Sequence, residues 1–134
     1  MTFQDIPYQR PRIEEAEKQM ASFQEAFKAT KTFDAQWEIM AEANRLRSHL
    51  FTMMILVNIR HSVNTLDPFY EAENAFFDEI SPRLEALNMS FYDMLLDSPF
   101  LAEFESKLGK HFFDVVRLSR KTFSPEIMEE LAQE

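Results

Sequence analysis

The scarcity of glycine constrains this fold more than any other feature of the sequence. The chain has a single glycine, Gly109, among 134 residues. Glycine supplies the positive φ angles of tight turns, so sandwiches and doubly wound sheets normally need several. Glu, Ala, Leu, Met and Lys, which favour helices, are by contrast abundant. We therefore predict an all-α protein with one helical domain over residues 1–134. It should be an antiparallel helical hairpin packed on a kinked third helix and shorter helices.

The first helix is predicted to begin at Pro11 and to end before residues 30–32. Proline suits the first position of a helix, and Thr32 or Asp34 can cap the helix that follows. Between these limits apolar residues recur at alternating steps of three and four, which indicates a seam packed on a partner helix. The seam consists of Ile13, Ala16, Met20, Phe23 and Phe27.

The second helix is predicted from about Asp34 to about Asn64, and its two halves differ. Up to Leu50 the apolar positions form one stripe. Beyond Leu50 the sequence is apolar all round, which is typical of a helix surrounded by other helices. We therefore expect the first two helices to form an antiparallel hairpin, with the far half of the second helix in the core. The apolar residues of that half include Phe51, Met53, Ile55, Leu56 and Ile59.

The third helix has a clear start signal and an internal proline. Asp67 and Pro68 mark the start, because aspartate caps helices and proline fits the first turn. Apolar residues then keep helical phase straight through Ser81 and Pro82. We therefore predict one continuous helix kinked at the proline rather than two separate helices. The apolar residues in phase are Phe69, Phe76, Ile80, Leu84, Leu87, Phe91 and Leu95.

Three short helices are expected after residue 97. The first opens at Ser98-Pro99 and is closed by Gly109, and the second runs from about 110 to 121. The third begins at Ser124-Pro125 and reaches the last residue without a glycine, asparagine or proline to cap it. This unfinished ending predicts that the chain is a fragment of a longer protein.

Charge and cysteine content exclude several classes of protein. The net charge is −9, and residues 67–105 carry ten acidic residues against one basic residue, Arg83. Nucleic-acid binding is disfavoured, because it depends on Lys and Arg at phosphates. The chain has no cysteine, so disulfides and thiolate metal sites are impossible. The N-terminus lacks the apolar core of a signal peptide, and the longest apolar run is about half a bilayer span. We predict a cytoplasmic protein.

The residues that common catalytic sites need are missing. One glycine excludes a phosphate-binding loop, and the lack of cysteine excludes a thiol nucleophile. His49, His61 and His111 belong to no His-Glu-x-x-His motif. No Glu is followed by His three positions later, which also disfavours a metal-storing helical bundle. We therefore predict no catalytic, cofactor-binding or metal-binding residue in this chain.

Polar residues gather around the end of the second helix and the start of the third. One interpretation is that Arg60, His61 or Glu71 contacts a ligand or substrate. The other is that Arg60 forms an ion pair across the hairpin with Glu71, Glu73 or Asp78, because buried charges need partners. We favour the ion pair. No histidine accompanies the acids, which disfavours a carboxylate metal site. The residues concerned are Asn58, Arg60, His61, Glu71, Glu73, Asp78 and Glu79.

Three stretches of the sequence carry a family resemblance: Met1 to Pro11, Ile59 to Glu79, and Lys121 to Ile127. They resemble the N-terminal region of oligoendopeptidase F zinc peptidases. The resemblance spans the whole chain and rests on residues that pack helices, not on catalytic motifs. It implies a cytosolic peptidase that cleaves short peptides inside a helical cavity. In that family the zinc-binding His-Glu-x-x-His helix lies far downstream of the residues present here.

The resemblance implies a role and no site residues. This chain would be one wall of the cavity, without zinc of its own. Its partners would be the catalytic part of the same protein and short peptides. The alternative is a stand-alone interaction module that binds a partner helix in a groove lined by Phe and Met. The isolated chain is also expected to self-associate through apolar faces left bare. These faces lie around Phe51, Met53 and Ile55, and at Ile127, Met128 and Leu131.

Overall fold

The computed structural model describes residues 5–122, which form five helices and contain no strand. The order is α1 (Ile13–Ala29), α2 (Phe33–Val63), α3 (Pro68–Leu96), α4 (Leu101–Leu108) and α5 (Lys110–Thr122). The prediction of an all-α bundle is thus confirmed. The helix predicted to begin at Ser124-Pro125 lies outside the described residues.

Local sequence signals set the ends of these helices. The side chain of Thr32 accepts a hydrogen bond from the backbone N–H of Ala35 (3.2 Å), so Thr32 caps α2 and Asp34 does not. Asp67 caps α3 in the same way through the N–H of Phe69 (2.9 Å). Gly109 ends α4 with a φ of 93°, a conformation that side-chain-bearing residues rarely adopt. The predicted start of α1 at Pro11 is wrong by two residues, because α1 begins at Ile13.

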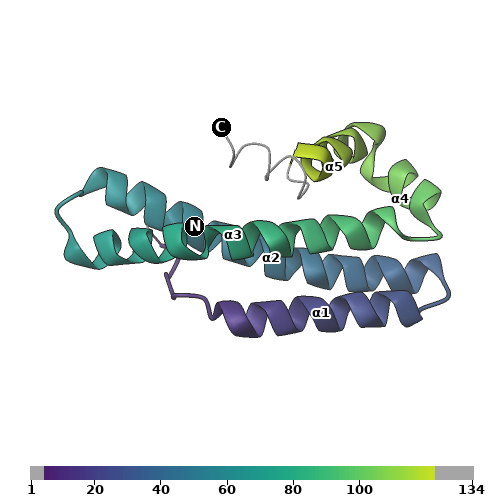
Figure 1. The fold of residues 1–134 in the computed structure, drawn as a ribbon, viewed down its shortest axis with the longest axis horizontal. Coiled ribbons are helices and arrows are strands. Elements are labelled where there is room, and N and C mark those ends of the chain that lie inside the picture. The colour runs from purple at the N-terminus through teal and green to yellow at the C-terminus, as the bar shows by residue number, and fades with distance from the viewer. Residues whose placement is uncertain (1–4, 123–134) are drawn as a thin grey trace, which may run out of the picture.

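The three long helices lie side by side, each antiparallel to the one before it (Figure 1). Helix α1 has 17 residues, whereas α2 has 31 and α3 has 29. At about 1.5 Å per residue, α1 covers only about half the length of the other two. The α2–α3 hairpin therefore extends beyond α1 on the left of Figure 1, while α4 and α5 pack at its other end.

The start of α1 divides the molecule into two parts. Glu14 and Glu17, in the first turns of α1, contact Arg83 of α3, and Ala16 lies beside Leu50 of α2. We call the hairpin beyond this level, residues 51–80, the arm. The rest of the described chain, with α1, α4, α5 and the adjoining halves of α2 and α3, is the body.

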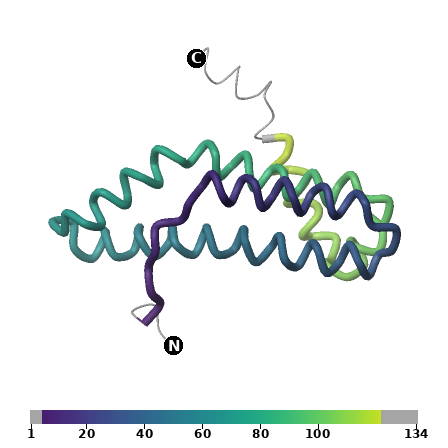
Figure 2. Tube along the Cα trace, turned by 90° about the horizontal axis from the view of Figure 1, so that it is seen from below, coloured from purple at the N-terminus to yellow at the C-terminus, as the bar shows by residue number. Residues whose placement is uncertain are grey.

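Helix α3 runs unbroken through Pro82, as predicted. Proline has no N–H to donate to the carbonyl of Asp78, and its ring crowds the preceding turn. Figure 2 shows that the axis of α3 changes direction partway along the helix. Pro82 thus lies where the arm joins the body, next to Arg83.

The core of the body is rich in aromatic side chains. Phe104 of α4 stacks on Phe27 and Trp37 with ring centroids 6.0 Å from each, and meets Phe33 edge-on at 4.9 Å. Gln36 is buried there and donates to the carbonyl of Phe27 (3.0 Å). Ser98 donates in turn to the side-chain oxygen of Gln36 (2.6 Å), so the buried polar groups satisfy one another.

Candidate functional site

The segment before α1 forms a strap across the hairpin at the base of the arm. Residues 5–12, which we call the strap, leave the start of α1 and cross the hairpin (Figure 2). The hydroxyl of Tyr8 donates to Oε1 of Glu73 (2.6 Å), and Nε of Arg10 donates to the same oxygen (2.9 Å). Arg10 also forms an ion pair with Oε2 of Glu73 and lies over the ring of Phe76, 4.4 Å from its centroid.

Glu73 is the central group of this strap lock, which we define as Tyr8, Arg10 and Glu73. It is only 4% exposed, yet it is charged, because Arg10 and Tyr8 supply its hydrogen bonds. The hydrogen bond from Arg10 holds the pKa of the Glu73 carboxyl below its usual range, against the opposing effect of burial. Burial and the neighbouring carboxylate raise the pKa of Tyr8, so its hydroxyl stays a donor. The lock is therefore complete at neutral pH.

Arg60 fastens the strap from the opposite helix. Its guanidinium donates to the carbonyl of Ile6 in the strap (2.7 Å) and to the hydroxyl of Tyr70 in α3 (3.0 Å). Arg60 was predicted to pair with Glu71, Glu73 or Asp78. Glu73 instead binds Arg10 and Tyr8, and Arg60 donates hydrogen bonds to Ile6 and Tyr70. The physical reason is competition, because the strap brings its own cation, Arg10, to Glu73. Arg60 still joins the elements of the hairpin, although through the strap backbone and a tyrosine.

The other polar residues predicted as site candidates do not gather into one site. Glu71, Asp78, Glu79 and Asn58 are exposed, and His61 is half-buried. Within residues 5–122 no three His, Cys, Asp or Glu side chains are grouped as metal ligands would be. The described residues therefore do not fit a zinc ion.

Sequence reasoning missed Tyr8 and Arg10 as members of a site. They lie in an extended segment with no periodic pattern, so nothing in the sequence indicates which face of the hairpin they reach. The only local signal is an aromatic and a cation placed two residues apart, which lets both side chains of an extended segment point the same way.

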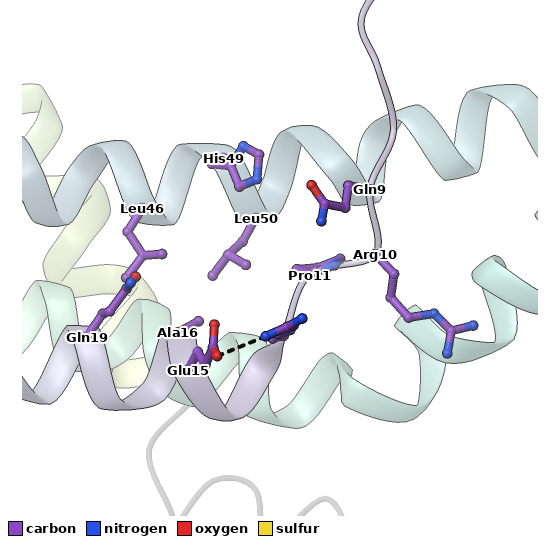
Figure 3. A pocket seen from close by; sticks show the side chains of 10 residues that line it. Gln9, Arg10, Pro11, Glu15, Ala16, Gln19, Leu46, His49 and Leu50 are labelled. Carbon is purple, nitrogen blue, oxygen red and sulfur yellow. Dashed lines mark hydrogen bonds and ion pairs between the residues drawn. The ribbon is translucent and has the colours of Figure 1, made fainter.

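A cavity of about 280 Å³ opens between the strap, α1 and α2 (Figure 3). Ala16, Leu46 and Leu50 form its apolar floor, whereas Gln9 and His49 stand at its rim. Arg10 turns away from this space toward α3, where Glu73 lies. The cavity is open and mixed in polarity, and its groups form no arrangement of nucleophile and base.

The fold and the strap together define the class of this chain as an all-α domain in which an N-terminal segment fastens a long helical hairpin. Residues 3–123 match the family described as the Peptidase M3 N-terminal domain. The chain belongs to that family. The comparison with curated protein sequences gives no match.

Three solved structures contain the same fold as part of a larger chain. A structure described as an oligoendopeptidase F from Bacillus anthracis str. Ames is 38% identical, with a TM-score of 0.88 over 98% of this chain and 24% of that one. Another structure described as an oligoendopeptidase F is 35% identical, with a TM-score of 0.87 over 99% and 24% of the two chains. PZ peptidase A, solved with an inhibitor, is 36% identical, with a TM-score of 0.86 over 97% and 23%.

This chain thus spans about a quarter of the length of the structures it matches. The resemblance to the N-terminal region of oligoendopeptidase F is confirmed, and so is the assignment as an N-terminal domain. None of the helices of residues 5–122 is long and apolar enough to cross a membrane.

Proposed function

We propose that this chain is the scaffold and substrate-enclosing domain of a peptidase similar to oligoendopeptidase F. One observation carries the proposal: almost the entire chain has the fold of a quarter of such peptidases, at 35–38% identity. In that setting its helices are one wall of the cavity that holds short peptides. The residues of the chain form one domain, and none is assigned a catalytic, cofactor-binding or metal-binding role.

Zinc and the chemistry of peptide cleavage belong, in this proposal, to the remainder of the peptidase. Bound zinc would activate a water molecule for attack on the peptide amide. The contribution of this chain is shape and rigidity. Its body presents a packed three-helix surface, and the strap lock keeps the arm at a fixed angle to that body. The location we propose is the cytoplasm, as the family resemblance implies.

A chimera tests this role. The N-terminal quarter of the Bacillus anthracis oligoendopeptidase F is replaced by this chain, and cleavage of a quenched fluorescent peptide is measured. We expect activity within about tenfold of the parent, because the same fold supplies the same wall. The matched control is the parent peptidase with that quarter deleted, which should be at least a hundredfold less active.

The isolated chain provides the second part of this experiment. We expect it to cleave no peptide and to retain no stoichiometric zinc after dialysis. A folded chimera without activity would contradict the scaffold role and favour the stand-alone interaction module. Peptide cleavage and bound zinc in the isolated chain would contradict the assignment of catalysis to the remainder.

A further inference from the structure

We propose that the outer face of the arm docks on another helix of the peptidase chain, outside the sequence described here. This inference rests on the proposed function and names the surface through which the domain joins the rest of the enzyme. The surface, which we call the arm stripe, consists of Ile55, Ile59, Val63 and Leu66.

Helical spacing places these side chains in one row. Ile55, Ile59 and Val63 are four residues apart on α2, so they lie above one another on the same face, and Leu66 follows in the turn. They are 43%, 41%, 83% and 88% exposed, respectively. The row faces away from the hairpin core, where Leu56 and Val57 of the same helix are fully buried.

The arm stripe also lacks the charges that solvent-exposed helices normally carry. From Ser48 to Leu66 the only Lys, Arg, Asp or Glu is Arg60, which binds the strap and Tyr70. The outer positions of α3 in the same arm are different, because Glu71, Asp78 and Glu79 are exposed there. One side of the arm is thus a normal solvated surface, and the other is an apolar surface that stays exposed within residues 5–122.

The size of the stripe argues for an occupant within the same polypeptide. The nine helical residues from Ile55 to Val63 span about 14 Å, so a stripe one helix wide that also includes Leu66 offers roughly 150–200 Å². A stable interface between separate molecules needs about 800 Å² on each partner. Two copies of the chain would therefore pair only weakly through this face. A helix of the same chain needs no such area, because the covalent connection keeps it at high effective concentration.

The solved relatives provide the chain that such a helix requires, since each is about four times as long as the matched region. An uncharged aliphatic row is complementary to another apolar helix face, because a charged partner would lose its hydration without gaining an opposite charge. We therefore identify the occupant as an apolar helix in the remainder of the peptidase.

Cysteine accessibility measures the burial of the stripe directly, because the chain has no cysteine of its own. Ile59→Cys is placed in the isolated chain and in the chimeric peptidase, whose recipient part has been stripped of cysteine. The rate of reaction with a maleimide is measured at low micromolar protein. Ala75→Cys, at an exposed position of α3 in the same arm, is the matched control.

We expect the thiol of the Ile59→Cys variant to react at least tenfold more slowly in the peptidase than in the isolated chain. The thiol of the Ala75→Cys variant should react equally in both. Equal rates for Ile59→Cys in an active chimera would overturn the docking inference and leave the scaffold role intact. Equal protection in the isolated chain and in the peptidase would assign the stripe to a second copy, which also overturns the inference. An inactive but folded chimera in which the Ile59→Cys thiol is protected would instead count against the scaffold role alone.

A second measurement keeps the inference testable if the chimera does not fold. The double substitution Ile55→Ser/Ile59→Ser is made in the isolated chain, and the urea midpoint is compared with that of wild type. At most a small decrease is expected, because these side chains are already 43% and 41% exposed in the isolated domain. A clearly lower midpoint would show that the stripe belongs to the chain's own core, and the docking inference would then be wrong.

Discussion

The body and the arm are built from the same two helices, α2 and α3, yet they are stabilised in different ways. In the body a third helix and the α4–α5 pair cover the hairpin, and aromatic side chains such as Phe27 and Phe104 are fully buried. In the arm no third helix is present among the described residues. A short strap takes its place and binds through Tyr8, Arg10 and Glu73.

The difference shows that apolar content alone does not determine what a helix segment packs against. The arm half of α2 is the more apolar half, but part of that surface stays exposed because only one helix faces it. A two-helix hairpin has a core on one side only, so the other side needs polar residues or a further partner. The lock and the arm stripe are the two consequences of this geometry.

The largest difference between the parts should appear when the same side chain is truncated in each. Phe104→Ala removes a fully buried ring from the body, and we expect the free energy of unfolding to fall by about 3–5 kcal/mol. Phe69→Ala removes a ring that is 54% exposed at the start of α3 in the arm, and we expect a loss below about 1 kcal/mol. Urea unfolding followed by circular dichroism measures both. Equal losses would mean that the arm is as well packed as the body.

A smaller loss in the free energy of unfolding is expected when the strap lock is disrupted. Glu73→Gln removes the charge that Arg10 and Tyr8 bind, and we expect about 1–3 kcal/mol of destabilisation at pH 7. The pKa of Glu73 is lowered in the folded state, so its stabilisation is present above the unfolded pKa of about 4.3 and is lost as pH falls through the folded value. The difference between wild type and variant should therefore shrink below about pH 4. A difference independent of pH between about 3 and 7 would contradict the lock.

Removal of Arg60 should have a still smaller effect. Arg60→Ala loses the hydrogen bonds to Ile6 and Tyr70, and we expect about 1–2 kcal/mol of destabilisation in urea. Arg45→Ala is the matched control, since Arg45 is exposed on the body half of α2 and pairs only with Glu42 one turn earlier. Its loss should stay below about 0.5 kcal/mol. Equal results for the two arginines would show that Arg60 does not fasten the strap.

Helix periodicity predicted most of the secondary structure, because the formation of each helix depends on residues close to one another along the chain. The continuity of α3 through Pro82, the cap at Asp67 and the closing role of Gly109 all follow from local rules. Single residues near helix ends were less predictable. The start of α1 shifted from Pro11 to Ile13, since Pro11 belongs to the strap.

The contacts between side chains of different helices were predicted less well, since they depend on the length of each helix and on where its ends lie. Arg60 was expected to bind an acidic side chain, but it binds Ile6 and Tyr70, because the competing cation Arg10 comes from a segment without a periodic pattern. The apolar surface expected around Phe51, Met53 and Ile55 is only partly correct. Met53 is buried and Phe51 is half-buried, whereas Ile55 is exposed. Which of these side chains is exposed depends on how far α1 extends along α2, and the sequence of α2 alone does not indicate that length.

Hydrogen exchange along α2 tests the division between body and arm, and the docking of the arm, most directly. Amides of residues 36–50 belong to the body and those of residues 55–63 to the arm, within a single helix. In the isolated chain we expect the arm amides to exchange at least tenfold faster, because local opening there exposes little packed surface. In the chimeric peptidase the arm amides should slow at least tenfold while the body amides stay unchanged. Uniform exchange along α2 in both proteins would contradict the account.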